Sequence, residues 1–142
     1  MKVLLAGGGT GGHVYPAIAI ANKIKEHNPD CEILFVGTKN GIESEIVPKA
    51  GFELKTVTVQ GFKRKIDLDN IKRVFKLCKG LEQSRRIVKK YKPDIVIGTG
   101  GYVSGPVLFN AAMNKRVTIV HEQNSFPGVT NKILSKVATK VL

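Results

Sequence analysis

The sequence predicts an α/β protein with a doubly wound parallel sheet. Apolar stretches typical of strands alternate with helical patterns along all 142 residues. The stretch Ile95-Val96-Ile97 is apolar without a break, which is typical of a parallel strand covered on both faces. A glycine-rich turn joins the first expected strand to the first expected helix. This alternation implies right-handed crossovers, and therefore a Rossmann-like sheet with helices on both faces.

Each element is expected from its own stretch of sequence. Apolar runs of β type predict strands at residues 2–6, 31–36, 53–59, 94–98 and 117–120, and a further strand begins at 140–142. Helical patterns predict helices at residues 16–27, 42–49, 69–91, 104–114 and 129–136. Pro16 is expected in the first turn of its helix, where its missing N–H group leaves no bond unmade. Element boundaries are expected at Pro29, Pro48, Pro93 and Pro127.

The turn after the first strand has the composition of an anion-binding loop. It reads Gly7-Gly8-Gly9-Thr10-Gly11-Gly12-His13 and is followed by a helix. Glycines let a ligand approach backbone N–H groups, and the helix start adds unpaired N–H groups and the positive end of its dipole. We therefore expect a phosphate or diphosphate here, and a tight turn without a ligand is the alternative.

The same loop formally matches the dinucleotide fingerprint at Gly7, Gly9 and Gly12. That fingerprint also needs an acid near the end of the second strand to bind a ribose, and Gly37-Thr38-Lys39 stands there instead. The Gly-Lys-Ser/Thr ending of a P-loop is absent as well. A nicotinamide-dependent oxidoreductase is therefore disfavoured.

Two further polar segments follow strands and are expected on the same edge of the sheet. Residues 98–106 form a second glycine loop before a helix, and Tyr102 and Ser104 in it offer hydroxyl donors. A packed aromatic side chain at the surface is the equal alternative for Tyr102. His121-Glu122-Gln123-Asn124 follows the fifth strand. Glu122 or His13 is a candidate proton acceptor, and Asn124 can bind a sugar hydroxyl. For each of these residues alone, a structural hydrogen bond is the alternative.

Positive charge is concentrated in one segment of the chain. The formal net charge is +12, and residues 62–92 hold twelve Lys or Arg residues against three acids. Either Asp67 or Asp69 can cap the helix in this segment. Apolar residues recur in it at helical spacing, namely Ile71, Val74, Phe75 and Cys78. The predicted membrane patch comprises Phe62, Lys63, Arg64, Lys65, Ile66, Lys72, Phe75 and Lys76.

The basic segment has two alternative interpretations. A charged, solvated face over ordinary core residues is one. Nucleic-acid binding is the other, and it is disfavoured because no stacking pattern of aromatic residues accompanies the charge. An anionic membrane surface is therefore the partner that the segment favours.

Other features concern the compartment, metals and the extent of the chain. No stretch approaches the roughly 20 apolar residues of a membrane span, and no signal peptide is visible, so the cytosol is expected. Cys31 and Cys78 are expected to be reduced and buried, and no metal-binding spacing of Cys or His occurs. Because residues 140–142 only begin a strand, we expect the chain to be a fragment of a longer protein.

Three motifs together resemble the MurG family of glycosyltransferases, and the likeness runs across the whole chain. They are Gly-Gly-Thr-Gly-Gly-His at 8–13, Gly-Gly-Tyr-Val-Ser-Gly-Pro at 100–106 and His-Glu-Gln-Asn at 121–124. The resemblance implies the N-terminal half of a GT-B glycosyltransferase, whose absent C-terminal domain holds most of the donor nucleotide. On this resemblance residues 1–142 are the acceptor- and membrane-binding domain.

The resemblance also implies an activity in peptidoglycan synthesis. The family transfers N-acetylglucosamine from UDP-N-acetylglucosamine to undecaprenyl-pyrophosphoryl-MurNAc-pentapeptide, converting lipid I to lipid II with inversion. The implied enzyme uses no metal ion or organic cofactor, binds no nucleic acid, and is peripheral to the cytoplasmic face of the cell membrane. This chain alone is expected to be inactive, and a non-catalytic, membrane-anchoring subunit of a split glycosyltransferase is the alternative.

The resemblance further implies roles for single residues. His13 is the first candidate for the catalytic base and Glu122 the second. The donor-binding residues are Thr10, Gly11, Gly12 and Asn124. The residues that would hold the acceptor diphosphate are Gly7, Gly8, Gly9, Gly100, Gly101, Tyr102, Ser104 and Gly105.

Overall fold

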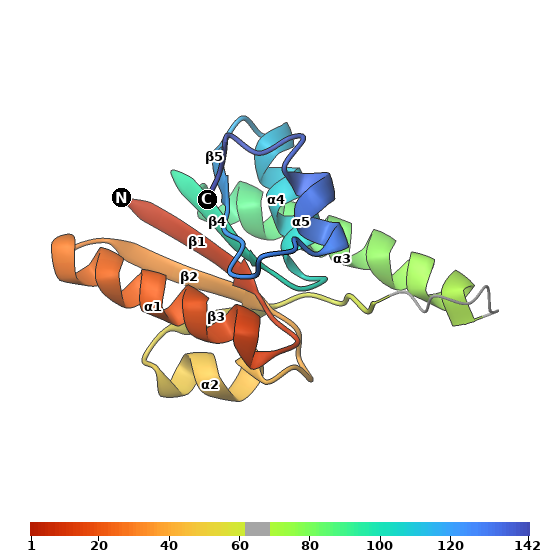
Figure 1. The fold of residues 1–142 in the computed structure, drawn as a ribbon, viewed down its shortest axis with the longest axis horizontal. Coiled ribbons are helices and arrows are strands. Elements are labelled where there is room, and N and C mark those ends of the chain that lie inside the picture. Colours follow the sequence, from red (N-terminus) through yellow and green to blue (C-terminus); the bar gives the residue numbers. More distant parts are fainter. Residues whose placement is uncertain (62–68) are drawn as a thin grey trace.

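The computed structural model describes residues 1–61 and 69–142 (Figure 1). In these two ranges six strands form one sheet in the order β3-β2-β1-β4-β5-β6, and all neighbouring strands are parallel. The strands are β1 (Lys2–Gly7), β2 (Glu32–Gly37), β3 (Glu53–Thr56), β4 (Ile95–Gly100), β5 (Val117–Val120) and β6 (Lys140–Val141). The helices are α1 (Gly11–His27), α2 (Glu43–Lys49), α3 (Asp69–Tyr91), α4 (Ser104–Met113) and α5 (Val129–Leu134).

Helices cover both faces of the sheet, as the sequence predicts (Figure 1). Val3 and Leu5 of β1 are buried in a cluster with α1 and α2. Leu4 and Ala6, which point to the other face, are buried in a cluster with α3, α4 and α5. Alternate residues of the central strand thus enter two separate hydrophobic cores. The prediction of a doubly wound parallel sheet is confirmed.

The first helix begins five residues earlier than the sequence predicts. α1 starts at Gly11, inside the glycine-rich segment, so Pro16 lies within the helix rather than in its first turn. Because Pro16 has no N–H group, the carbonyl of Gly12 lacks its usual donor within the helix. The loss is small, since Gly12 lies close to the start of the helix. Because α1 begins at Gly11, His13 belongs to its first turn.

Two other elements depart from the predictions. β3 ends at Thr56 instead of residue 59, because its neighbour β2 ends at Gly37, the residue paired with Thr56. Pro48 lies inside α2 rather than at a boundary. The remaining elements begin and end within two residues of their predicted positions.

The two cysteines differ in exposure. Cys31 is buried at the start of the sheet, as expected, but Cys78 is exposed on α3. The prediction of a buried Cys78 is therefore wrong. The apolar residues at helical spacing in the first half of α3 share this exposure: Ile71, Val74 and Phe75 are 56%, 49% and 72% exposed. This stripe does not pack against the described part of the core.

Candidate functional site

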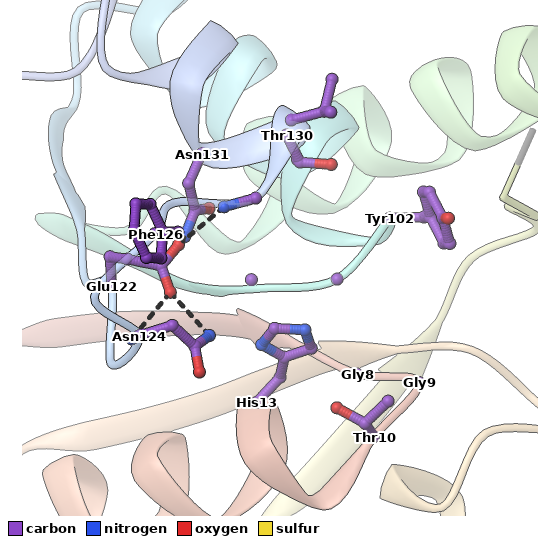
Figure 2. Close-up of a pocket in the computed structure, with 14 residues that line it drawn as sticks. Gly8, Gly9, Thr10, His13, Tyr102, Glu122, Asn124, Phe126, Thr130 and Asn131 are labelled. Carbon is purple, nitrogen blue, oxygen red and sulfur yellow. Dashed lines mark hydrogen bonds between the residues drawn. The ribbon is translucent and has the colours of Figure 1, made fainter.

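A cleft of about 490 Å³ lies where β1, β4 and β5 end (Figure 2). All three strands present their carboxyl ends there, which is the usual ligand-binding edge of an open parallel sheet. The cleft is lined by Gly8, Gly9, Thr10, His13, Gly100, Gly101, Tyr102, Glu122, Asn124, Phe126, Gly128, Val129, Thr130 and Asn131. The three polar segments singled out in the sequence therefore meet in one place.

The two glycine loops touch each other. β1 and β4 are neighbours in the sheet, and Gly7 pairs with Gly100 across a register shift. Gly101 has φ +81, and a Cβ there would collide with the carbonyl oxygen of Gly8. Only a residue without a side chain allows this backbone-to-backbone approach. The loops form one continuous rim, which is the arrangement that the sequence predicts.

The start of α1 faces this rim without a side-chain cap. Thr10 is the N-cap residue, yet its hydroxyl makes no capping hydrogen bond, and the first turn holds no acidic residue. The first N–H groups of a helix have no acceptor within the helix. The start of α1 therefore presents the positive end of its dipole beside Thr10, which lines the cleft.

Not every predicted binding residue lines the cleft. Gly7, Gly11, Gly12, Ser104 and Gly105 are not among the lining residues. Ser104 is fully buried, and its hydroxyl donates to the carbonyl oxygen of Gly101 at 2.8 Å. That hydroxyl therefore stabilises the second loop, and it is not presented to the cleft. Tyr102 lines the cleft and is 58% exposed.

His13 is held firmly at the floor of the cleft. The Thr99 hydroxyl donates to the backbone carbonyl of His13 at 2.7 Å, and the carbonyl oxygen of Thr99 lies 3.1 Å from His13 Nδ1. A Cβ on Gly100 would lie 2.5 Å from the same Nδ1. The imidazole thus packs directly on the backbone of the second glycine loop, and Gly100 provides the space for it. Figure 2 shows the ring pointing into the cleft.

Glu122 is surrounded by hydrogen-bond donors. Its carboxylate accepts from the N–H and the side-chain amide of Asn124, from the N–H of Gly128, and from the side-chain amide of Asn131 (Figure 2). Burial raises the pKa of this carboxyl, but the four donors outweigh it and leave the pKa below the ordinary value of 4.5. A carboxylate so stabilised is a weak proton acceptor. Its visible role is to fix the segment that carries Asn124 and to orient Asn131.

The sequence interpretation missed Glu43, which lies under the first glycine loop. Its side chain is fully buried and accepts from the N–H of Gly9 at 3.0 Å and from the N–H and hydroxyl of Thr38, both at 2.7 Å. Burial raises the pKa of Glu43, but these hydrogen bonds lower it by a larger amount. The pKa therefore lies below the ordinary value of 4.5. The N–H of Gly9 is thereby engaged inside the protein rather than offered to a ligand.

Glu43 also bears on the argument from the missing ribose acid. A carboxylate does lie at the carboxyl end of β2, because Glu43 reaches back from α2 to Thr38. It is buried under the loop with its acceptors occupied, so it is not free to bind a ribose. The spacing of residues along the sequence does not predict this contact. The available signal is an acidic residue at the start of a helix that follows a strand.

Asn131 and Gln123 were not predicted either. Asn131 is 4% exposed and lines the cleft, and its side-chain oxygen has no partner among the described residues. Its orientation is fixed because its NH₂ group donates to Glu122. The side-chain oxygen of Gln123 and Nδ1 of His121 are also buried without a partner in the described ranges. Of these three residues, Asn131 lines the cleft, whereas His121 and Gln123 do not.

The predicted membrane patch is described only in part. Phe62, Lys63, Arg64, Lys65 and Ile66 lie outside the described residues. Lys72, Phe75 and Lys76 are exposed on the first half of α3. In Figure 1 this end of α3 extends away from the sheet. No helix in the described ranges is both long and apolar enough to cross a bilayer.

The sheet order and the polar cleft define a Rossmann-like domain of the class that forms the N-terminal half of GT-B glycosyltransferases. Residues 3–142 match the model of the glycosyltransferase family 28 N-terminal domain. The chain belongs to this family.

Curated relatives share most of the chain. A protein from Clostridioides difficile (strain 630), named UDP-N-acetylglucosamine--N-acetylmuramyl-(pentapeptide) pyrophosphoryl-undecaprenol N-acetylglucosamine transferase, is 84% identical over 142 residues, which are 100% of this chain and 35% of that protein. A relative of the same name from Thermoanaerobacter sp. (strain X514) is 60% identical over 136 residues, covering 96% of this chain and 37% of the relative. The chain therefore spans little more than a third of the length of these relatives.

Solved structures give the same fold. The crystal structure of Acinetobacter baumannii MurG matches with a TM-score of 0.85 and 32% identity, over 99% of this chain and 40% of that one. A UDP-GlcNAc 2-epimerase from Neisseria meningitidis, solved with UDP-GlcNAc, matches with a TM-score of 0.66 and 15% identity, over 97% and 39%. The second likeness shows the fold alone.

Proposed function

We propose that this chain is the acceptor-side domain of an inverting glycosyltransferase of peptidoglycan synthesis. The reaction moves N-acetylglucosamine from UDP-N-acetylglucosamine to undecaprenyl-pyrophosphoryl-MurNAc-pentapeptide. The names of the relatives support these substrates. The observation that carries the proposal is the joining of two glycine loops, an uncapped helix start and His13 in one cleft.

The acceptor diphosphate is proposed to lie along the rim of the two loops. Gly8, Gly9, Gly100 and Gly101 of the two loops line the cleft, and the start of α1 adds the positive end of its dipole. Thr10 and Asn124, at opposite sides of the same cleft, are left to contact the donor sugar nucleotide. The proposed reaction uses no metal ion or organic cofactor.

His13 is proposed to be the general base. The attacking hydroxyl oxygen of the acceptor forms a bond to the anomeric carbon of N-acetylglucosamine, and the hydroxyl proton passes to the imidazole. The bond from that carbon to UDP breaks, and its electron pair leaves with UDP. Glu122 is the weaker candidate, because four donors stabilise its carboxylate.

The membrane is the remaining proposed partner. Exposed Phe75 beside Lys72 and Lys76 presents an apolar tip between cationic groups, which suits insertion among anionic headgroups. We infer a peripheral enzyme on the cytoplasmic face of the cell membrane. A non-catalytic anchoring subunit is not favoured, because the relatives carry the matching segment within one longer chain.

Substitution of His13 tests the catalytic part of the proposal. The assay uses a chimaera in which this chain replaces the matching segment of the Clostridioides difficile relative, whose remaining length supplies the rest of the enzyme. His13→Ala is expected to lower turnover by roughly 10²-fold or more, the scale of a lost general base. His27→Ala, exposed at the far end of the same helix, should leave turnover unchanged. Near-normal turnover of His13→Ala would remove His13 from this role.

A further inference from the structure

Two neighbours make opposite demands on Nδ1 of His13. The carbonyl oxygen of Thr99, 3.1 Å away, can only accept a hydrogen bond, whereas Nε2 of Gln123, 2.8 Å away, can only donate one. A ring nitrogen of neutral histidine is either a donor or an acceptor. With this orientation of the amide, one of the two contacts is repulsive whichever tautomer His13 adopts.

A half-turn of the Gln123 amide removes the conflict at Nδ1 and moves the NH₂ group to the buried position that the oxygen now holds. Rotation by 180° about its terminal bond exchanges Oε1 with Nε2 and leaves the shape of the side chain almost unchanged. The amide oxygen now has no partner among the described residues although it is buried. After the rotation it faces Nδ1, and a proton on Nδ1 then has two acceptors, Gln123 Oε1 and Thr99 O.

The imidazole of His13 is packed closely against the second glycine loop. The Thr99 hydroxyl holds the backbone of His13, and the imidazole packs on Gly100, where even a methyl group would collide with it. The hydrogen bonds that the ring makes with described residues all involve Nδ1. Nε2, on the other side of the ring, is left for the cleft.

We propose that Gln123 is a positioning residue that, together with the carbonyl of Thr99, keeps the proton of neutral His13 on Nδ1 and leaves the lone pair on Nε2. The inference rests on the proposed function, in which His13 is the base. A base needs its lone pair on the nitrogen that faces the attacking hydroxyl, and the hydrogen bond of the other nitrogen decides which one that is. Gln123 then acts on the reaction only through His13.

The tautomer is directly measurable on this chain by ¹⁵N NMR of its three histidines. The His13 signals are assigned from their loss in His13→Ala. At a pH where His13 is neutral, we expect its Nδ1 to be protonated and its Nε2 to be unprotonated. A His13 ring protonated on Nε2 would overturn the proposal, and this result needs no variant of Gln123.

Two variants test the part that Gln123 plays. Gln123→Met offers only the weak acceptor of a thioether, so we expect a mixture of tautomers and, in the chimaera, a loss of kcat of about 10-fold with an unchanged KM for UDP-N-acetylglucosamine. Gln123→Glu keeps an acceptor, so we expect it to preserve the Nδ1 proton and to recover most of kcat. Asn22→Met, at an exposed amide side chain on α1, is the control and should change neither property.

The proposal would be overturned if Gln123→Glu lowered kcat more than Gln123→Met does. If Gln123 donates to Nδ1, Gln123→Glu is the damaging change. Unchanged tautomer and kcat in Gln123→Met would likewise overturn it, because Thr99 would then suffice. Failure of the base role is a separate result: normal turnover of His13→Ala refutes the proposed function, whatever tautomer the NMR spectrum shows.

Discussion

Glu43 is the single residue on which the shape of the first glycine loop most depends. Cβ atoms added to Gly8, Gly37 or Gly41 would each collide with its side chain. The three glycines therefore make room for one buried carboxylate, which in turn fixes the backbone at Gly9. A negative charge under an anion-binding loop is tolerated because its own donors compensate it.

Replacing Glu43 by Gln is expected to destabilise the chain at neutral pH by about 2 kcal/mol, since a hydrogen bond to a charged group contributes roughly 1.5–3 kcal/mol. The amide would also turn an NH₂ group toward a donor. Because the pKa of Glu43 in the folded chain lies below 4.5, its contribution is present above that value and is lost as the pH falls through the folded-state pKa.

Urea unfolding at neutral pH and near pH 3 measures this effect. The difference in free energy of unfolding between wild type and Glu43→Gln should shrink at the lower pH. Glu45→Gln is the matched control, because Glu45 is exposed on the same helix and pairs with Lys49 at the surface. A difference that is the same at both pH values would show that the charge of Glu43 is not what stabilises the loop.

Residue roles were the least predictable part of the site. His13, Tyr102, Glu122 and Asn124 reach the cleft because each follows a strand that ends there, and this much the sequence reveals. Sequence order does not reveal that Ser104 turns inward or that Glu43 reaches back from α2. Both contacts depend on the packing of loops, which no spacing along the chain encodes.

Among the elements, α1 shows best what the pattern of residues hides. Two glycines at its start are typical of a loop, so the predicted helix began at Pro16. The pattern of residues does not predict a helix that begins within a glycine run and lacks a side-chain cap. β3 was predicted too long for a different reason, because its length depends on the end of its neighbour β2.

The first half of α3 carries the described part of the proposed membrane patch. Its exposed apolar stripe and its lysines belong to the end of α3 that extends away from the sheet (Figure 1). The second half of the same helix packs on the core through Gly80, Ser84 and Val88. The two halves therefore offer a matched comparison within one element.

Sedimentation with anionic vesicles makes that comparison. Lys72→Glu with Lys76→Glu is expected to weaken binding by roughly tenfold or more, because each cation near the surface contributes about 1 kcal/mol. Lys89→Glu with Lys90→Glu changes the net charge equally at the other end of α3 and should weaken binding less. Equal losses in both pairs would indicate attraction by net charge alone, without a defined patch.

For the whole molecule, the sheet was predictable because its central strands are mostly apolar and because strands alternate with helices. Ile95, Val96 and Ile97 belong to β4, which pairs with both β1 and β5 at the centre of the sheet. This topology alone brings the ends of β1, β4 and β5 together. The substrates were not predictable from the topology, and they rest on the motifs and on the relatives.

The central claim is that the two loops bind a diphosphate, and backbone amide NMR of this chain during titration with farnesyl diphosphate tests it most directly. We expect the amide signals of residues 8–13 and 100–102 to shift together and to saturate, with farnesyl monophosphate binding more weakly. Shifts confined to the first half of α3, with both glycine loops unchanged, would contradict the account.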